Sequence, residues 1–77
     1  MQNNVNDITP EYLTDEQAAF LLGGLSPLTL RNSRVRGVLL GHKAPPWVKL
    51  GRLVRYRRRD LLKWAERNAV ERRTAQG

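Results

Sequence analysis

Residues 14–37, TDEQAAFLLGGLSPLTLRNSRVRG, contain the start and stop signals of two short helices. Thr14 can cap the first helix, and Gln17 lies three residues later, where it completes a capping box. Gly23 and Gly24 then end that helix after about two turns. Because two helices joined by a tight glycine turn are typical of a helix-turn-helix, we expect that motif here.

The second helix of this stretch is expected to begin after Ser26, its N-cap, and to run through Arg36. Pro27 fits the first helical position, where a backbone N–H has no partner, and Gly37 suits the left-handed residue that follows a helix. Helical spacing predicts core-facing positions at Ala18, Leu21 and Leu22 in the first helix and at Leu30 and Val35 in the second. The side chains expected to point outward are Arg31, Asn32, Arg34 and Arg36.

A β-hairpin is predicted from residues 47–50 and 53–57, two β-prone runs separated by Gly51 and Arg52. Glycine at the first central position is typical of a type II′ turn. Alternation predicts one apolar face and one basic face. The apolar face would carry Val48, Leu50, Val54 and Tyr56, and the basic face would carry Lys49, Arg55 and Arg57. Trp47 and Leu53 fall on the basic face as well, so the alternation is imperfect.

The remaining segments complete an α+β, mostly α fold with the order helix, helix, hairpin, helix. Residues 38–46 contain turn residues, but the apolar run 38–40 predicts that part of this loop packs on the core. A last helix over residues 59–70 would turn Leu61, Trp64 (or Leu62), Ala65 and Ala69 inward. Tyr56 and Trp64 are therefore expected in the core rather than on a stacking platform, whereas Trp47 can cap the loop, pack under the second helix or stay partly exposed.

The charge of the chain is unevenly distributed. The 77 residues include 14 Lys and Arg and 7 Asp and Glu, a formal net charge of +7, and residues 1–16 hold four acidic side chains and no base. All 14 bases lie in residues 17–77. This concentration indicates a surface that binds a polyanion, with a basic surface that merely aids solubility as the alternative.

The length allows one domain, expected at residues 12–70 between a mobile tail at 1–11 and a frayed end at 71–77. The chain contains no cysteine, which fits a reducing compartment. No apolar run reaches the roughly 18 residues that a membrane span needs, and the N-terminus does not resemble a secretory signal. We therefore expect a cytoplasmic protein with no membrane partner.

The sequence contains no recognisable arrangement of catalytic residues. His42 is the single histidine and has no carboxylate near it in the sequence. There is no glycine-rich phosphate loop, zinc-ligand spacing or nucleophile elbow. The sequence predicts neither an enzyme nor a cofactor or metal.

The second helix is the candidate for the major groove of duplex DNA, which is about 12 Å wide and admits one helix. Arg31 can pair with guanine, Asn32 can pair with adenine, and Thr29 can contact a phosphate, a thymine methyl group or its own cap residue. The expected DNA-binding residues of this helix are Ser26, Pro27, Leu28, Thr29, Arg31, Asn32, Arg34 and Arg36.

The hairpin is the second candidate DNA contact, because a narrow A·T-rich minor groove attracts arginine. Its tip would carry Arg52 into that groove or onto the flanking phosphates. The expected DNA-binding residues of this wing are Lys49, Gly51, Arg52, Arg55, Arg57 and Arg58.

Residues 12–67 resemble the winged helix-turn-helix DNA-binding domains of the MerR-like excisionase and AlpA type. The matching residues are 13–19, 22–23, 26–27, 29–30, 34–37, 44–52, 54–57, 60–61 and Trp64. The sequence departs from the family pattern in its double glycine at 23–24, its longer loop at 38–44 and Ser33, which stands where relatives often carry an aromatic residue. Trp47 or Leu40 would then fill that core position.

The resemblance implies a winged helix that binds double-stranded DNA of bacteria or their mobile elements and is associated with the nucleoid. Members of this family act as recombination directionality factors that bend DNA at an attachment site, with an integrase and further copies of themselves as partners. A small transcription regulator on the same fold is the first alternative. A basic adaptor that binds RNA or an acidic protein is the remoter one.

Overall fold

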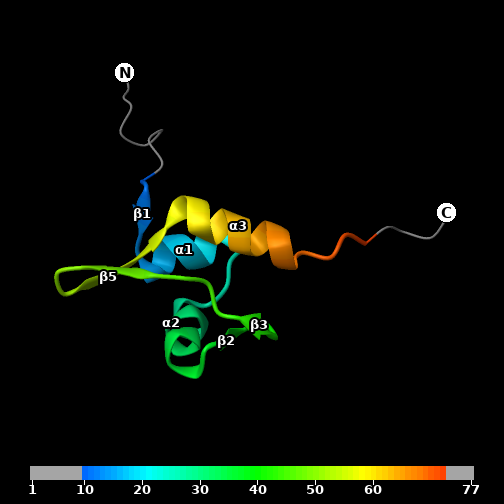
Figure 1. Ribbon diagram of the computed structural model, residues 1–77, viewed down its shortest axis with the longest axis horizontal. Coiled ribbons are helices and arrows are strands. Elements are labelled where there is room, and N and C mark those ends of the chain that lie inside the picture. The colour runs from blue at the N-terminus through cyan, green and yellow to red at the C-terminus, as the bar shows by residue number, and fades with distance from the viewer. Residues whose placement is uncertain (1–9, 73–77) are drawn as a thin grey trace, which may run out of the picture.

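The computed structural model describes residues 10–72 and shows an α+β fold with three helices and a small antiparallel sheet (Figure 1). The helices are α1 (Asp15–Leu21), α2 (Pro27–Arg36) and α3 (Arg58–Asn68). The strands are β1 (Tyr12–Leu13), β2 (Val38–Leu39), β3 (His42–Lys43), β4 (Val48–Leu50) and β5 (Leu53–Arg57). The order of elements differs from the predicted one, because β1 precedes α1 and the β2–β3 ribbon separates α2 from β4.

The sheet has the strand order β1-β5-β4, so the first strand of the chain pairs with the second strand of the hairpin. Leu13 lies opposite Tyr56, and the Arg58 N–H donates to the Glu11 carbonyl at 2.8 Å. Glu11, expected in the tail, is therefore held against the start of α3. Residues 1–9 of that tail and 73–77 of the expected frayed end lie outside the described residues.

The predicted start signals of α1 and α2 are confirmed. Thr14 Oγ1 accepts from the Gln17 N–H at 3.1 Å, and Gln17 Oε1 accepts from the Thr14 N–H at 2.9 Å. Ser26 Oγ accepts from the Leu28 N–H at 3.2 Å. These bonds satisfy backbone N–H groups that the first turn of a helix leaves without partners.

The inward face of α1 differs from the prediction at its last residue. Ala18 and Ala19 are buried and Leu22 packs partly against the core, but Leu21 is exposed. A helix advances by about 100° per residue, so Leu22 lies near the middle of the buried face and Leu21 about 110° away from it.

The inward face of α2 was also predicted wrongly at one position. Leu30 and Ser33 are buried, whereas Val35 is 88% exposed. Val35 lies about 140° around the helix from Leu30, so the two cannot share one face. Ser33 lies about 60° from Leu30, and its hydroxyl donates to the Leu30 carbonyl at 2.6 Å.

The β4–β5 hairpin has the predicted strands and turn but different faces. Gly51 has a φ of +62°, whereas the φ of Arg52 is not positive. A type II′ turn requires this combination. The register pairs Val48 with Arg55, Lys49 with Val54 and Leu50 with Leu53. Directly opposite residues share a face. The predicted separation into an apolar and a basic face was therefore wrong, because a two-residue turn fixes residue 50 opposite residue 53.

The core is small and lies where α1, α2, α3 and β5 meet. Its buried residues are Leu13, Ala18, Ala19, Leu30, Leu39, Tyr56, Leu61 and Trp64. The burial of Tyr56 and Trp64 confirms their predicted place. Residues 40 and 47, the candidates to fill space near Ser33, are largely exposed, and of the apolar run 38–40 only Leu39 is buried.

The last helix begins one residue earlier and ends two residues sooner than predicted, so Ala69 lies beyond it and is exposed. Trp64 Nε1 donates to the Lys43 carbonyl at 2.6 Å, which fastens the β2–β3 ribbon to α3. Within residues 10–72 the structure contains no helix with the length and apolar character of a membrane span.

Candidate nucleic-acid interface

Positive charge is uninterrupted over most of the fold. Residues 17–59 contain ten Lys and Arg and no Asp or Glu. This acid-free segment includes α2, the β4–β5 hairpin and the start of α3. Glu16 and Asp60 border it. Asp15 forms ion pairs with Arg31 and Arg34 inside the segment, and Asp60 forms one with Arg57. These pairs decide which arginines remain free to meet a ligand.

The exposed side of α2 carries most of the residues expected to contact DNA. We call it the α2 face, and it consists of Leu28, Thr29, Arg31, Asn32 and Arg36, all of them exposed. Arg31 has 63% of its side chain accessible, although its Nε lies 3.5 Å from Asp15 Oδ2. The Thr29 hydroxyl forms no hydrogen bond with a described residue. Its proposed bond to its own cap is therefore absent.

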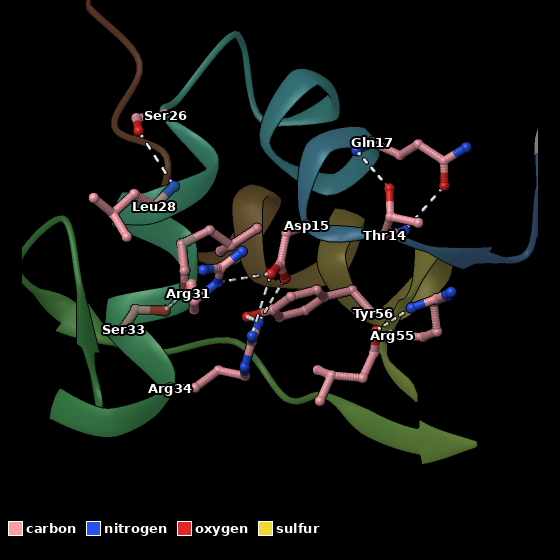
Figure 2. Close-up of polar contacts among 12 residues, drawn as sticks. Thr14, Asp15, Gln17, Ser26, Leu28, Arg31, Ser33, Arg34, Arg55 and Tyr56 are labelled. Atoms are coloured by element: carbon pink, nitrogen blue, oxygen red, sulfur yellow. Dashed lines mark hydrogen bonds and ion pairs between the residues drawn. The ribbon is translucent and has the colours of Figure 1, made fainter. Parts of the chain in front are cut away.

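Arg34, which was predicted to point outward, is instead a structural residue. Its side chain is only 13% exposed. It donates two hydrogen bonds to Asp15, from Nη1 to Oδ1 at 2.6 Å and from Nη2 to Oδ2 at 3.2 Å (Figure 2). Nη1 also donates to the Tyr56 hydroxyl at 3.0 Å. Arg34 lies about 40° around the helix from Leu30, on the inward stripe, so it cannot point outward.

The cluster of Asp15, Arg34 and Tyr56 therefore joins α1, α2 and β5. Burial alone would raise the pKa of the Asp15 carboxyl, but hydrogen bonds and charge from Arg34 and Arg31 outweigh it and hold that pKa below its ordinary value of 3.8. The bond from Asp15 in turn raises the pKa of Arg34. Both groups are ionised at neutral pH, and their charges largely cancel.

Sequence reasoning assigned Asp15 only to the first-turn dipole of α1 and missed its role as the partner of Arg34. The available signal was helical spacing, because Arg34 follows Leu30 by four residues and so lies on the buried side of α2. The guanidinium also lies over two aromatic rings, 5.6 Å from the Tyr56 centroid and 5.9 Å from that of Trp47. Trp47, left open in the sequence, thus packs beside Arg34 while remaining partly exposed.

At the tip of the hairpin, Lys49 and Arg52 are exposed and form no ion pair with any described residue. Gly51 is exposed between them. Arg55 is half-buried, and its Nη1 donates to the carbonyl of its neighbour Val54 at 2.7 Å. Arg55 also has no acidic partner among the described residues, but Lys49 and Arg52 are more exposed, so the most accessible positive charge of the wing lies at its end.

The other two predicted wing residues are occupied at the base of the hairpin. Arg57 Nη1 lies 3.1 Å from Asp60 Oδ2, and the Tyr12 hydroxyl together with Asp60 raises the pKa of Arg57. Arg58 Nη2 lies 3.8 Å from Glu11 Oε1. The Nε atoms of both arginines are buried without a partner among the described residues. These two side chains fasten the junction of β1, β5 and α3 rather than extend from the wing.

The described residues bring together no group of His, Asp and Glu side chains that could hold a metal ion. His42 is exposed, and its ring meets the edge of Trp64 at a centroid distance of 6.4 Å. The chemistry available at this surface is thus hydrogen bonding, charge and apolar contact from the α2 face and the hairpin tip. Comparison with family models, curated proteins and solved structures finds no match to this chain.

Proposed function

We propose that this chain is a sequence-specific double-stranded DNA-binding protein that uses its fold as a winged helix. The observation that carries the proposal is the pairing of an exposed, acid-free α2 face with a projecting hairpin whose tip holds Lys49 and Arg52 without ion-pair partners. In Figure 1 the hairpin extends to the left, away from the C-terminal end of α3, and α2 lies below it. The helix and the wing would occupy neighbouring grooves.

In this arrangement α2 enters the major groove with its N-terminal half towards the bases. Arg31 pairs with guanine O6 and N7, Asn32 pairs with adenine N6 and N7, and Leu28 meets a thymine methyl group. Backbone N–H groups at the start of the helix donate to the oxygens of a phosphate. Arg34 takes no part in base contact and instead sets the angle at which α2 is presented.

The hairpin supplies the second contact. Arg52 enters a minor groove next to the segment read by α2, and Lys49 and Arg36 lie against phosphates. Arg57 and Arg58, which are engaged in ion pairs, hold the base of the wing at the junction of β1, β5 and α3. This division differs from the one expected from sequence, because only the end of the wing binds DNA.

The biological role that we propose is that of a recombination directionality factor, on the basis of the resemblance described above. The protein would bend an attachment site so that an integrase favours excision. Regulation of transcription by the same DNA-binding surface is the second candidate, and the two require different target sites.

A DNase footprint on the DNA that flanks the gene of this protein distinguishes these roles. Several phased sites beside an attachment core are expected for an excision factor, and one palindrome at a promoter is expected for a regulator. Excision by the integrase in the presence and absence of the protein is the matched functional measurement. An unchanged excision rate would exclude the first role.

The same purified chain should be titrated with a duplex DNA, a double-stranded RNA of equal length and a polyglutamate peptide. We expect the duplex DNA to bind most tightly. Equal binding to all three would contradict the proposed function and favour a general basic adaptor.

A further inference from the structure

The tip of the hairpin carries an apolar pair beside its charged residues. Leu50 and Leu53 lie directly opposite each other on either side of the turn residues Gly51 and Arg52. Their exposed fractions are 47% and 53%, and neither belongs to the core cluster. Side chains of directly opposite residues lie about 5 Å apart and on one face, so the two leucines form a single apolar edge.

The stability of the hairpin does not by itself require leucine at positions 50 and 53. Threonine or valine would favour the strands as well and would expose less apolar surface. The two leucines flank the turn of the β4–β5 hairpin, and this hairpin projects furthest to the left in Figure 1. An apolar edge at a projecting tip, next to an unpaired arginine, fits a ligand that is anionic outside and apolar within.

We propose that Leu50 and Leu53 form a wedge that enters the minor groove and partly unstacks one base step, while Arg52 anchors the tip in the groove. This inference rests on the proposed function and specifies how the wing acts. Stacked bases are the apolar interior of DNA, and leucine is among the side chains that proteins insert between them. The wedge therefore assigns a kinking role to the hairpin.

The dimensions of the two surfaces support a deformation of the DNA. Two paired strands lie about 4.8 Å apart before their side chains are counted, and the minor groove of regular duplex DNA is only about 6 Å wide. The tip can therefore enter deeply only where the groove opens. Opening is easiest at pyrimidine–purine steps such as TA, which are readily unstacked, and insertion there kinks the duplex towards the major groove.

The chemistry of the groove floor selects the same step. An A·T pair presents only acceptor atoms there, whereas a G·C pair adds the N2 amino group of guanine. Burying that donor under a leucine would leave it without a partner. The ligand of the wedge is thus a TA step in an A·T-rich segment beside the sequence read by α2.

The test begins with 30-base-pair duplexes that the full chain enriches from a random-sequence pool. 2-Aminopurine, whose fluorescence rises when it leaves the stack, replaces each adenine of an enriched duplex in turn. With the wild-type chain we expect a rise at one TA step. We also expect a bend in the same duplex, measured by energy transfer between dyes at its two ends.

Two double variants separate the wedge from the stability of the hairpin. Leu50→Thr with Leu53→Thr keeps strand-forming residues but removes the apolar edge, and should abolish the fluorescence rise, reduce the bend and weaken binding about tenfold. Leu50→Ile with Leu53→Ile keeps the apolar edge and should retain all three. Leu62→Ala, an exposed leucine of α3, is the control and should behave as the wild type.

The outcomes distinguish the wedge from the proposed function itself. Failure to enrich any duplex would overturn DNA binding and the wedge together. An enriched duplex that shows no fluorescence rise with the wild type, or a rise that the threonine pair retains, would overturn the wedge alone. Circular dichroism of each variant verifies that its hairpin is folded. If the threonine pair unfolds, the fluorescence with the wild type and with the isoleucine pair still tests the wedge, and no rise with either would overturn it.

Discussion

At the scale of single residues, the arginines of this chain divide into those that hold the fold and those that face outward. Arg34 shows the division most clearly, since it is bonded to Asp15 and Tyr56 and is nearly buried. Arg31, one turn earlier on the same helix, is mostly exposed. Composition counts these two residues alike, but only the second exposes most of its side chain, although it too lies beside Asp15.

The first prediction concerns the pH dependence of stability. Because the folded pKa of Asp15 lies below its unfolded value of 3.8, its ionised form stabilises the protein above that pH. This stability is lost as the pH falls through the lower, folded pKa. We expect the melting temperature of the wild type to fall more steeply than that of Asp15→Asn as the pH drops below 3.8.

Comparing the two chains isolates Asp15, since every other carboxyl group is present in both. At neutral pH the variant should be less stable by about 1–2 kcal/mol, because Arg34 loses its charged acceptor. Parallel melting curves at all pH values would contradict the role given to the Asp15–Arg34 pair.

The second prediction compares two alanine variants of α2. Arg34→Ala should lower the free energy of unfolding by about 2 kcal/mol, because it leaves Asp15 and the Tyr56 hydroxyl without their main partner. Arg31→Ala should change that free energy by less than about 0.5 kcal/mol and should relax the base preference at one position. Urea unfolding and binding to single-substitution duplexes measure the two effects. A larger loss of stability in Arg31→Ala than in Arg34→Ala would contradict the roles given to the two arginines.

At the scale of elements, local signals predicted where the helices and hairpin begin and end. The capping box at Thr14, the Ser26 cap and the Gly51 turn each involve neighbours in the sequence, so residue type and spacing were sufficient. The facing of side chains was harder to predict. Spacing from Leu30 places Arg34 on the inward side of α2, but its partners lie 19 and 22 residues away, and no local pattern identifies them.

The prediction of the two hairpin faces was wrong for a reason that belongs to this scale. Side chains alternate along each strand as expected, but the turn, and not hydrophobicity, sets which residues of the two strands lie opposite each other. The length of the turn alone fixes Leu50 opposite Leu53. The β1 strand was missed for a different reason, because a two-residue strand such as Tyr12–Leu13 carries no period at all.

The third prediction tests the wing as an element. Arg52→Ala should weaken binding to all duplexes by a similar factor and should make the slope of log K against log salt shallower by about 1. Lys63→Ala removes the same charge from the exposed side of α3 and serves as the matched control. Fluorescence anisotropy at several salt concentrations gives both quantities. Equal weakening by the two variants would show that net charge, and not the wing, determines affinity.

At the scale of the whole molecule, the proposed interface uses far fewer charges than the chain contains. The chain has 14 Lys and Arg, but several are paired within the fold. The exposed bases of the α2 face and the hairpin tip are Arg31, Arg36, Lys49 and Arg52. Net charge therefore overstates the electrostatic part of the affinity.

The fourth prediction follows from that difference. If about four phosphates are neutralised, the slope of log K against log salt for duplex DNA should be about −4. A slope near −10 would mean that bases scattered over the whole surface contribute, and a slope near zero would contradict a phosphate interface altogether. Titrations between low and physiological salt, with one duplex throughout, measure it.

The pairing of β1 with β5 has a consequence for synthesis of the chain on the ribosome. The helices α1 and α2 emerge early, but β1 must wait for Tyr56 and Arg57 before it has a strand to join. Until then Arg34 also lacks the Tyr56 hydroxyl. An incomplete chain that ends within the wing would therefore contain both helices but no complete sheet, and proteases could cleave it. We expect the cell to contain this domain either complete or degraded, with few partly made copies that could compete for its target.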